Sequence, residues 1–430
     1  METYAAALSY AIPGFLVLII IEYLVSRWRK KSVNVAMDTI SSISSGITNI
    51  LKSLVGLTVV ILSYEVMVEH IALIEIQSTV LVYVLTLVGL DFAGYWSHRF
   101  NHEVNLFWNR HIVHHSSEEF NLSCALRQSI SSIVSIYFFL YIPLALLGVP
   151  AKVVAIVAPI HLFAQFWYHT RLINKMGFLE HIIVTPSHHR VHHAINDIYL
   201  DKNYSEIFII WDKLFGTFQK ELPEEPPVYG VKKPVRTWNP FLINFMHVWG
   251  IMKDAWRTEH WKDKLRIWFM PTGWRPEDVK ERYPVHITED PYNREKYHTE
   301  SSFFLKMWAW FQLFFTVLLM YYLLISVAKL SFLSIVSYTV FLMVAVFAYT
   351  ALMDRHKIAT PAEVIKAGFG FFLISQENGW FGVDQLFAGA SYVVVGYLIV
   401  SLGLTLYFQL VEQKAFRKLT PQPKALNVNS

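Results

Sequence analysis

The sequence has a single cysteine and few charged residues, and both shortages exclude classes of protein. Cys124 cannot form an internal disulfide, and one thiol cannot build a cysteine-type zinc or iron–sulfur site. Any bound metal must therefore be held by nitrogen and oxygen ligands. Charged residues make up 16% of the 430 residues, whereas a soluble domain has about 25%. The net charge of +4 is spread along the chain and does not indicate a nucleic-acid partner.

The chain is rich in hydrophobic residues, which make up 54% of it. A membrane-spanning helix needs about 20 mostly apolar residues. The first apolar run lacks a basic leader and a cleavage site, so we expect it to remain as a membrane anchor. The expected fold class is an all-α integral membrane protein, a multi-pass helical bundle. Its spanning or membrane-buried helices are predicted near residues 4–26, 47–69, 76–97, 129–148, 151–170, 303–327, 331–353 and 386–411.

These runs divide the chain into five expected parts and predict an orientation. Basic residues at 27–31 follow the first run, and the positive-inside rule places such residues in the cytoplasm. Two pairs of spans then leave and return, so residues 98–115 and 169–193 are expected on that same side. The parts are N-terminal membrane helices (1–75), a catalytic core (76–220), a cytoplasmic segment capping it (221–302), C-terminal membrane helices (303–413) and a polar tail (414–430).

Histidine is the most informative residue of the chain. Twelve of the eighteen histidines lie between His98 and His193, most of them in the patterns HxxxH, HxxHH and HxxHH. Residues three or four apart share one face of a helix, so each cluster presents its imidazoles in one direction. Eight imidazoles exceed the three or four protein ligands of a usual zinc site, which favours two metal ions. The eight are His98, His102, His111, His114, His115, His189, His192 and His193.

Nitrogen-rich ligation suits iron, zinc or copper. Iron can activate oxygen, whereas redox-inert zinc does not explain an oxidation within a membrane. Iron is therefore the favoured metal for an oxidation, although the residues themselves also admit zinc or copper.

Single histidines near the clusters have different expected roles. His169 ends an apolar run at the depth of the clusters and is the candidate ninth ligand. His188 points about 100° away from His189 around a helix, so it is expected beside the ligands or facing substrate. His161 lies deeper, where a hydrogen bond between helices is expected. The histidines outside 98–193 are expected to have ordinary roles.

Two carboxylates are candidate catalytic residues. Asp91 lies two turns before His98 inside an apolar run, where an ionisable residue suggests a functional site. It could accept a hydrogen bond from a ligand imidazole, or reach water at a helix end. Glu103 follows His102 and could bind metal, orient a histidine or face solvent.

The order of the three clusters resembles that of the fatty acid hydroxylase/sterol desaturase superfamily of membrane enzymes. Longer strings resemble its branch of tetrahydrobiopterin-dependent alkylglycerol monooxygenases, and this match covers residues 85–220. After about residue 220 it is too loose to carry residues over. The strings lie at 91–105, 114–129, 165–170, 185–193, 201–204 and 211–218.

The resemblance implies a diiron centre that uses O2 to hydroxylate a lipid C–H bond. In the alkylglycerol branch this carbon adjoins the ether oxygen, the products are fatty aldehyde and glycerol, and tetrahydrobiopterin donates electrons. It implies an endoplasmic reticulum location in a eukaryote, or the cytoplasmic membrane in a bacterium. Lipid and O2 are the implied partners, and no obligate protein partner is evident.

The resemblance also bears on single residues. Glu103 belongs to the first box of the branch, which implies a functional role. Gln165 stands where hydroxylases of sphingolipid acyl chains have another histidine, so the ligand number stays between eight and ten. Gln165, Asn121 and His188 are the expected neighbours of the ligands.

Two alternatives remain at this stage. One is another reaction of the superfamily, such as hydroxylation or desaturation of a sterol, fatty acid or carotenoid. The other is a membrane metal transporter, which should place ionisable residues across the bilayer midplane near broken helices. The clusters here gather at one face, which favours the enzyme.

Overall fold

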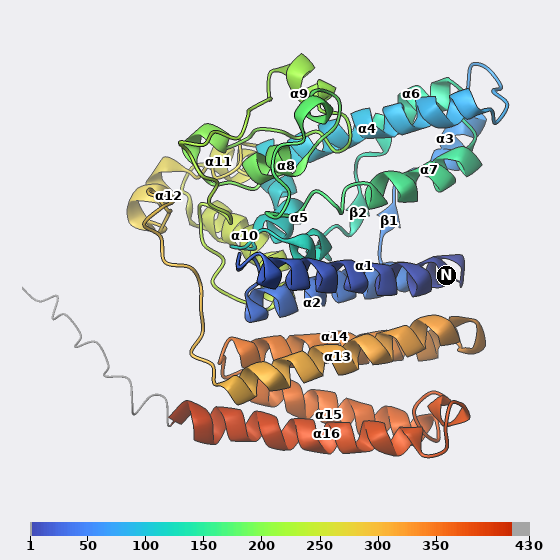
Figure 1. Ribbon diagram of the computed structural model, residues 1–430, viewed down its shortest axis with the longest axis vertical. Helices are drawn as coiled ribbons and strands as arrows, with labels where there is room; N and C mark the ends of the chain where they lie inside the picture. The colour runs from blue at the N-terminus through green and yellow to red at the C-terminus, as the bar shows by residue number, and fades with distance from the viewer. Residues whose placement is uncertain (1, 415–430) are drawn as a thin grey trace, which may run out of the picture. The chain divides into compact units, whose positions relative to one another are not determined.

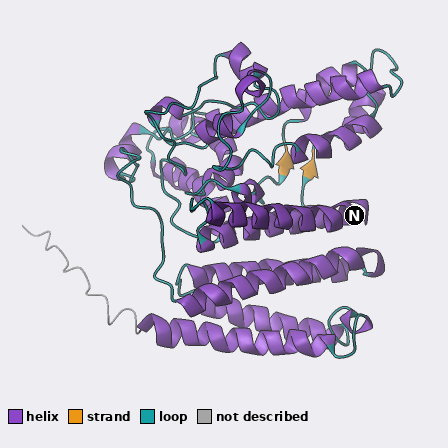
Figure 2. Cartoon of the chain, viewed as in Figure 1, coloured by secondary structure: helices purple, strands orange, loops and turns teal. Residues whose placement is uncertain are grey.

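The computed structural model describes residues 2–414, and the regular secondary structure of these residues is almost entirely helical (Figures 1 and 2). Strands β1 (Val59–Val60) and β2 (Val134–Ser135) form a short parallel pair. Of the polar tail expected at 414–430, all but the first residue lies outside the described part. The α-helices are α1 (Glu2–Trp28), α2 (Ala36–Leu54), α3 (Tyr64–Ile71), α4 (Val80–Glu103), α5 (Asn105–His115), α6 (Ile142–Leu146), α7 (Ala151–Phe163), α8 (Pro186–His192), α9 (Ile210–Phe215), α10 (Pro240–Arg257), α11 (Trp261–Arg266), α12 (Glu277–Arg282), α13 (Phe303–Ser326), α14 (Phe332–Met353), α15 (Ala359–Gln376) and α16 (Ala390–Tyr407).

Five helical segments are long and apolar enough to cross a membrane. They confirm five of the predicted spans, those near 4–26, 76–97, 303–327, 331–353 and 386–411. The segments are Ala5–Trp28, Val80–Glu103, Phe303–Lys329, Phe332–Met353 and Ala390–Glu412.

None of the three remaining predicted runs forms a spanning helix, because turn residues interrupt them. The run at 47–69 is broken where Gly56 adopts a left-handed conformation, φ +67°, and where Ser63 caps α3. The run at 129–148 holds only β2, a 3-10 turn and the five-residue α6. The run at 151–170 forms helix only as far as Phe163, so α7 has 13 residues.

The argument from paired spans therefore fails, but other contacts bring the same regions to one end of the fold. Near the C-terminal end of α1, Glu22 accepts a hydrogen bond of 2.6 Å from the Thr170 hydroxyl. The Arg29 guanidinium, just after α1, donates to the Leu172 carbonyl at 2.8 Å. Figure 1 shows α1 and α4 running in the same direction. The basic residues that follow α1 thus lie at the end of the fold where α4 presents its histidines.

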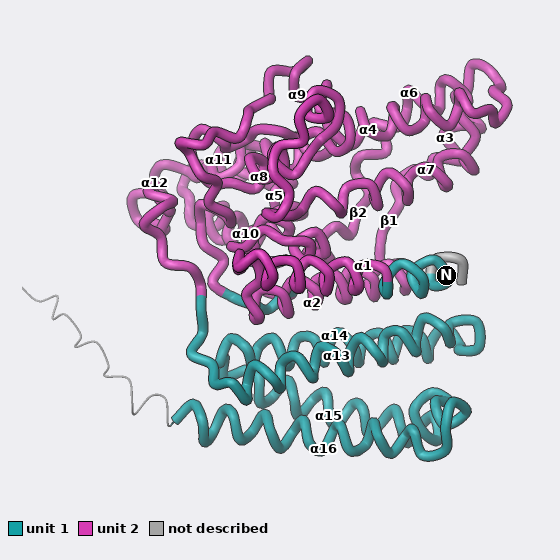
Figure 3. Tube along the Cα trace, viewed as in Figure 1, with its two compact units in different colours: residues 1–13, 237–240, 298–430 teal, residues 14–236, 241–297 magenta. Residues whose placement is uncertain are grey.

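The chain forms two compact units, distinguished by colour in Figure 3. One comprises residues 14–236 and 241–297 and contains all three histidine clusters. The other contains α13 to α16, and Ser302 and Ser331 cap the first two of these helices through their side chains.

The histidine-bearing helices of the first unit are tightly held at their ends. α4 passes directly into α5 through Val104, which is extended at φ −109° and ψ 124°. α8 begins at Pro186, a residue suited to a first helical turn. The buried Arg127 guanidinium pairs with Asp38 of α2 at 2.7 Å and donates to the Ser116 hydroxyl at 2.8 Å. This pair fixes the end of α5, because separating a buried ion pair costs about 3–5 kcal/mol.

Candidate metal centre

The structure gathers nine imidazoles into two groups. All nine predicted ligands are present, including His169. Within each group, one nitrogen from each ring lies within 4.8 Å of all the others. We call them the five-histidine group, which is His98, His102, His111, His115 and His192, and the four-histidine group, which is His114, His169, His189 and His193.

The two groups touch one another. His115 and His193 stack with ring centroids 4.2 Å apart, although they belong to different groups. The cause is the HxxHH pattern, since consecutive residues of a helix point about 100° apart. His114 and His115 therefore diverge, and so do His192 and His193. Two metal positions close together follow from this arrangement.

Hydrogen bonds at the far ring nitrogens determine how several of these imidazoles face the groups. The Nδ1 of His98 lies 2.7 Å from the Tyr204 carbonyl oxygen, and the Nδ1 of His192 lies 3.0 Å from that of Lys202. A carbonyl only accepts, so Nδ1 carries the proton in each ring. The Nε2 atom is then left as a bare lone pair facing the group, as in a metal-bound histidine.

The close approach of these nitrogens tests whether the residues fit a cation. The Nε2 of His98 lies 2.9 Å from the Nε2 of His111, and that of His192 lies 3.1 Å from the Nε2 of His115. In the other group, His169 donates Nδ1 to the Gln165 carbonyl, and its Nε2 lies 2.8 Å from the Nε2 of His189. Where both facing nitrogens are unprotonated, their lone pairs repel one another unless a cation lies among them, so the donor set fits metal ions.

Burial keeps these rings neutral. It lowers the pKa of His111, His115 and His192 well below the ordinary value, and neighbouring imidazoles lower it further. The pKa values of His189 and His193 are lowered in the same way. Neutral imidazole is the form that binds metal.

The carbonyls that orient the five-histidine group come from residues 201–212, which we call the orienting segment. Asp201 and Asn203 adopt left-handed conformations, φ 57° and 56°, which are uncommon for residues other than glycine. The Asp212 carboxylate holds the segment by accepting from the backbone amides of Tyr204 at 2.8 Å and Ser205 at 2.9 Å. Sequence reasoning missed Asp212 and these carbonyls, although the matching strings at 201–204 and 211–218 cover them.

Asp91 lies outside both groups and holds the same segment from the other side. Its buried carboxylate accepts from the amides of Ile207 at 2.8 Å and Phe208 at 3.0 Å, and from the Trp211 indole at 2.9 Å. His161 lies 3.0 Å from it, which confirms the hydrogen bond between helices expected of that histidine. Asp91 therefore holds the segment whose carbonyls accept from His98 and His192.

The remaining candidates also lie outside the two groups. Glu103 pairs with Arg99 at 2.8 Å, and its side chain is 41% exposed. His188 caps the start of α8 together with Thr185. Asn121 caps the turn at 122–126 by accepting from the Ser123 amide at 3.0 Å.

Comparisons with known proteins agree with this geometry. A family model described as fatty acid hydroxylase matches residues 83–217. The chain is 36% identical to the alkylglycerol monooxygenase of Homo sapiens over 361 residues, 83% of this chain and 80% of that protein. It is 32% identical to that of Danio rerio over 408 residues, 94% of this chain and 89% of that protein. An ornithine lipid hydroxylase of Rhizobium tropici is 34% identical over 136 residues, 31% of this chain and 41% of that protein.

No solved structure matches the chain significantly. The identities to relatives extend over most of the chain, and the family model covers the histidine-bearing core. The protein is thus a membrane lipid hydroxylase with a histidine-rich metal site, and it belongs to the alkylglycerol monooxygenase family.

Proposed function

We propose that the protein hydroxylates the ether-linked carbon of alkylglycerols with O2. Hydroxylation at that carbon gives a hemiacetal, which collapses to a fatty aldehyde and glycerol. The observation that carries the proposal is the pair of adjoining histidine groups in a chain 36% identical to an alkylglycerol monooxygenase. The nine imidazoles are proposed as the protein ligands of two irons, which would supply the oxygen-activating chemistry.

Residues of the chain hold and orient the imidazoles that are proposed as metal ligands. The Tyr204 and Lys202 carbonyls fix the tautomers of His98 and His192, so that their Nε2 atoms face the metal position. Phe120 covers the four-histidine group, where its ring stacks on His169 with centroids 5.8 Å apart. We expect this aromatic cover to exclude water from the second metal position.

The proposed electron donor is tetrahydrobiopterin, and Glu103 is proposed as a catalytic residue. The Glu103 carboxylate is partly exposed and lies one residue beyond the ligand His102. The basic residues after α1 lie at the same end of the fold as the histidines, as the Arg29–Leu172 hydrogen bond shows. By the positive-inside rule we propose that the site faces the cytoplasm, from the endoplasmic reticulum of a eukaryote or the cytoplasmic membrane of a bacterium.

A product assay tests the function. Purified protein loaded with ferrous iron receives an alkylglycerol, tetrahydrobiopterin and O2, and fatty aldehyde is measured by mass spectrometry. We expect aldehyde to form with the alkylglycerol and not with the matching ester-linked acylglycerol. Turnover of a sterol or free fatty acid, without aldehyde from the ether lipid, would overturn the proposal.

A further inference from the structure

We propose that a pocket above the five-histidine group receives the water-soluble reductant of the reaction, a planar reduced pterin. This inference rests on the proposed function, which requires an external electron donor. It adds where the donor binds and which residues of the chain bind it.

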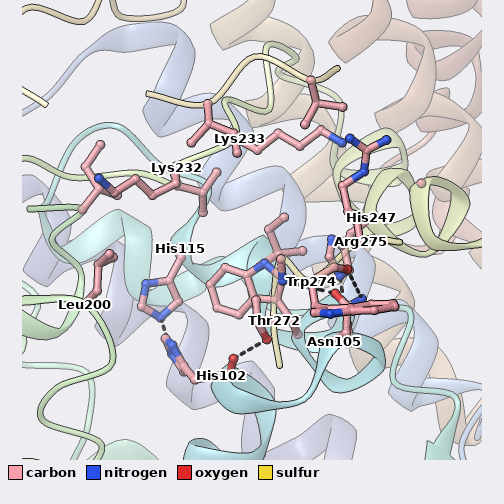
Figure 4. A pocket seen from close by; sticks show the side chains of 18 of the residues that line it. His102, Asn105, His115, Leu200, Lys232, Lys233, His247, Thr272, Trp274 and Arg275 are labelled. Atoms are coloured by element: carbon pink, nitrogen blue, oxygen red, sulfur yellow. Dashed lines mark hydrogen bonds between the residues drawn. The ribbon is translucent and has the colours of Figure 1, made fainter. Parts of the chain in front are cut away.

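The pocket has a volume of about 290 Å³ and reaches the metal ligands directly. Its lining includes His102, His115 and His192, all from the five-histidine group, and no member of the four-histidine group. Figure 4 shows His102 and His115 on the side of the pocket opposite Lys233. A molecule in this pocket would therefore lie against one of the two metal positions.

The helices and loops that line the pocket indicate that its occupant enters from the aqueous phase. Most of the lining comes from α5, α10 and the loops at 194–201, 230–233 and 271–275. Of the five segments able to span a membrane, only α4 contributes, through His102 in its last turn. A lipid tail would be expected to reach the site between spanning helices, whereas a soluble molecule would enter through these loops.

The reaction requires such a molecule. O2 accepts four electrons, of which the lipid C–H bond supplies two and the donor must supply two. One oxygen atom then enters the lipid hydroxyl group, and the other leaves as water with two protons. A tetrahydropterin supplies both electrons and both protons as it becomes a dihydropterin. The one cysteine of the chain, Cys124, is buried and cannot form a redox-active dithiol pair.

The polar groups of the pocket complement a pterin. The Lys233 ammonium has no hydrogen-bond or ion-pair partner among residues 2–414, whereas Lys232 pairs with Asp197 and Arg275 pairs with Asp254. The Asp201 carboxylate is 65% exposed, with an oxygen 3.8 Å from the Nδ1 of His102. A pterin carries N–H donors along its aminopyrimidinone edge, which suit a carboxylate, and a carbonyl that suits an ammonium.

Two tryptophans in the pocket lining provide flat aromatic faces that suit a planar pterin. Trp108 lies 4.9 Å from His102 and 5.5 Å from His115 between ring centroids, and Trp274 lines the same pocket. Aromatic rings favour planar heterocycles through offset stacking. His247, for which the sequence suggested no special role, also lines the pocket, and its Nε2 donates to the Asn105 carbonyl at 2.8 Å.

Gly250 offers a way to fill the pocket without disturbing the core. It lies on α10 and lines the pocket, and a Cβ placed there would meet only the Lys233 ammonium, at 3.9 Å. Gly250→Leu therefore adds bulk where the reductant is proposed to lie. Leucine is also a better helix former than glycine by about 0.8 kcal/mol, so the variant should fold. Gly368→Leu on α15 is the matched control, because a Cβ there meets nothing within 4 Å.

The experiment measures tetrahydrobiopterin binding to the iron-loaded, detergent-purified full chain by anaerobic equilibrium dialysis. We expect Gly250→Leu and Lys233→Met each to weaken binding at least tenfold, with iron content unchanged and Gly368→Leu like wild type. Normal pterin binding in both pocket variants would overturn the inference. So would a raised KM for alkylglycerol with unchanged pterin affinity, because it would make the pocket a lipid site.

The same experiment separates this inference from the proposed function. If wild type forms aldehyde and binds the pterin, but the pocket variants bind it normally, only the location is wrong. If wild type neither binds the pterin nor forms aldehyde with it, the proposed donor fails and the pocket assignment fails with it.

Discussion

The two histidine groups are built from neighbouring residues of the same motifs, yet their surroundings differ. The five-histidine group is oriented by backbone carbonyls of residues 202 and 204 and borders the pocket. The four-histidine group is covered by Phe120 and Tyr168, whose rings lie 5.2 Å from His193 and 4.4 Å from His189. The Nδ1 of His189 is buried without a hydrogen-bond partner within residues 2–414.

This difference suggests a division of labour between two metal positions. An orienting hydrogen bond raises the basicity of a ligand and fixes its direction. Only His169 of the four-histidine group is bonded in this way to a backbone carbonyl among the described residues, whereas His98 and His192 are so bonded in the five-histidine group. Its contact with the pocket makes it the position that soluble molecules reach. The aromatic cover of the other group makes that position the drier one.

The largest effect is expected from His192→Ala and His193→Ala, adjacent residues that serve different groups. Each variant should retain about one of two metal equivalents and lose more than about 100-fold in activity. Metal analysis and aldehyde formation measure both quantities. The two variants should also differ in spectrum, because each empties a different position. Identical spectra and unchanged metal content would contradict the two-group account.

A smaller effect is expected from Asp212→Asn, which puts an amide where two backbone N–H groups donate. The orienting segment should shift, and the metal affinity of the five-histidine group should fall about 10–100-fold. Metal titration with spectroscopic detection measures this affinity, and the four-histidine position should be unchanged. Asp290→Asn, at an exposed carboxylate, is the control. Equal weakening of both positions would show that Asp212 serves only general folding.

Phe120→Leu should lower metal affinity at the four-histidine group, and by less than Asp212→Asn lowers it at the five-histidine group. Leucine keeps an apolar cover but removes the ring that stacks on His169 and contacts His193. We expect metal affinity at the four-histidine position to fall less than about tenfold, because no ligand is reoriented. The same titration measures it. If Phe120→Leu lowered metal affinity more than Asp212→Asn does, the aromatic cover would matter more than the orienting hydrogen bonds, contrary to our account.

Glu206→Gln should leave both metal positions intact and change only the pH dependence of stability. Burial raises the pKa of Glu206 to about 7, against the opposing effect of His161. The unfolded chain ionises this group near its ordinary value, so wild-type stability should fall as pH rises from about 4.5 to 7. The glutamine variant should lose this part of the pH dependence in thermal unfolding scans. If the variant's stability still fell with pH as steeply as that of wild type, the raised pKa of Glu206 would not be the cause.

The sequence predicted which histidines gather in the two groups, because their spacing is a local property of a helix. His169 and the hydrogen bond of His161 also followed from position within an apolar run. The partners of the ligands could not be predicted, because they come from distant parts of the chain: His98 and Tyr204 are 106 residues apart. Three apolar runs were mistaken for spans, since composition does not reveal a turn at Gly56.

Mössbauer spectroscopy of the purified chain, loaded with iron-57, tests the central claim most directly. The account predicts two irons per chain in unlike, nitrogen-rich environments, because the two histidine groups share no ligand. His114→Ala and His192→Ala should each remove one of the two signals. A single iron per chain, or an unchanged spectrum in both variants, would contradict it.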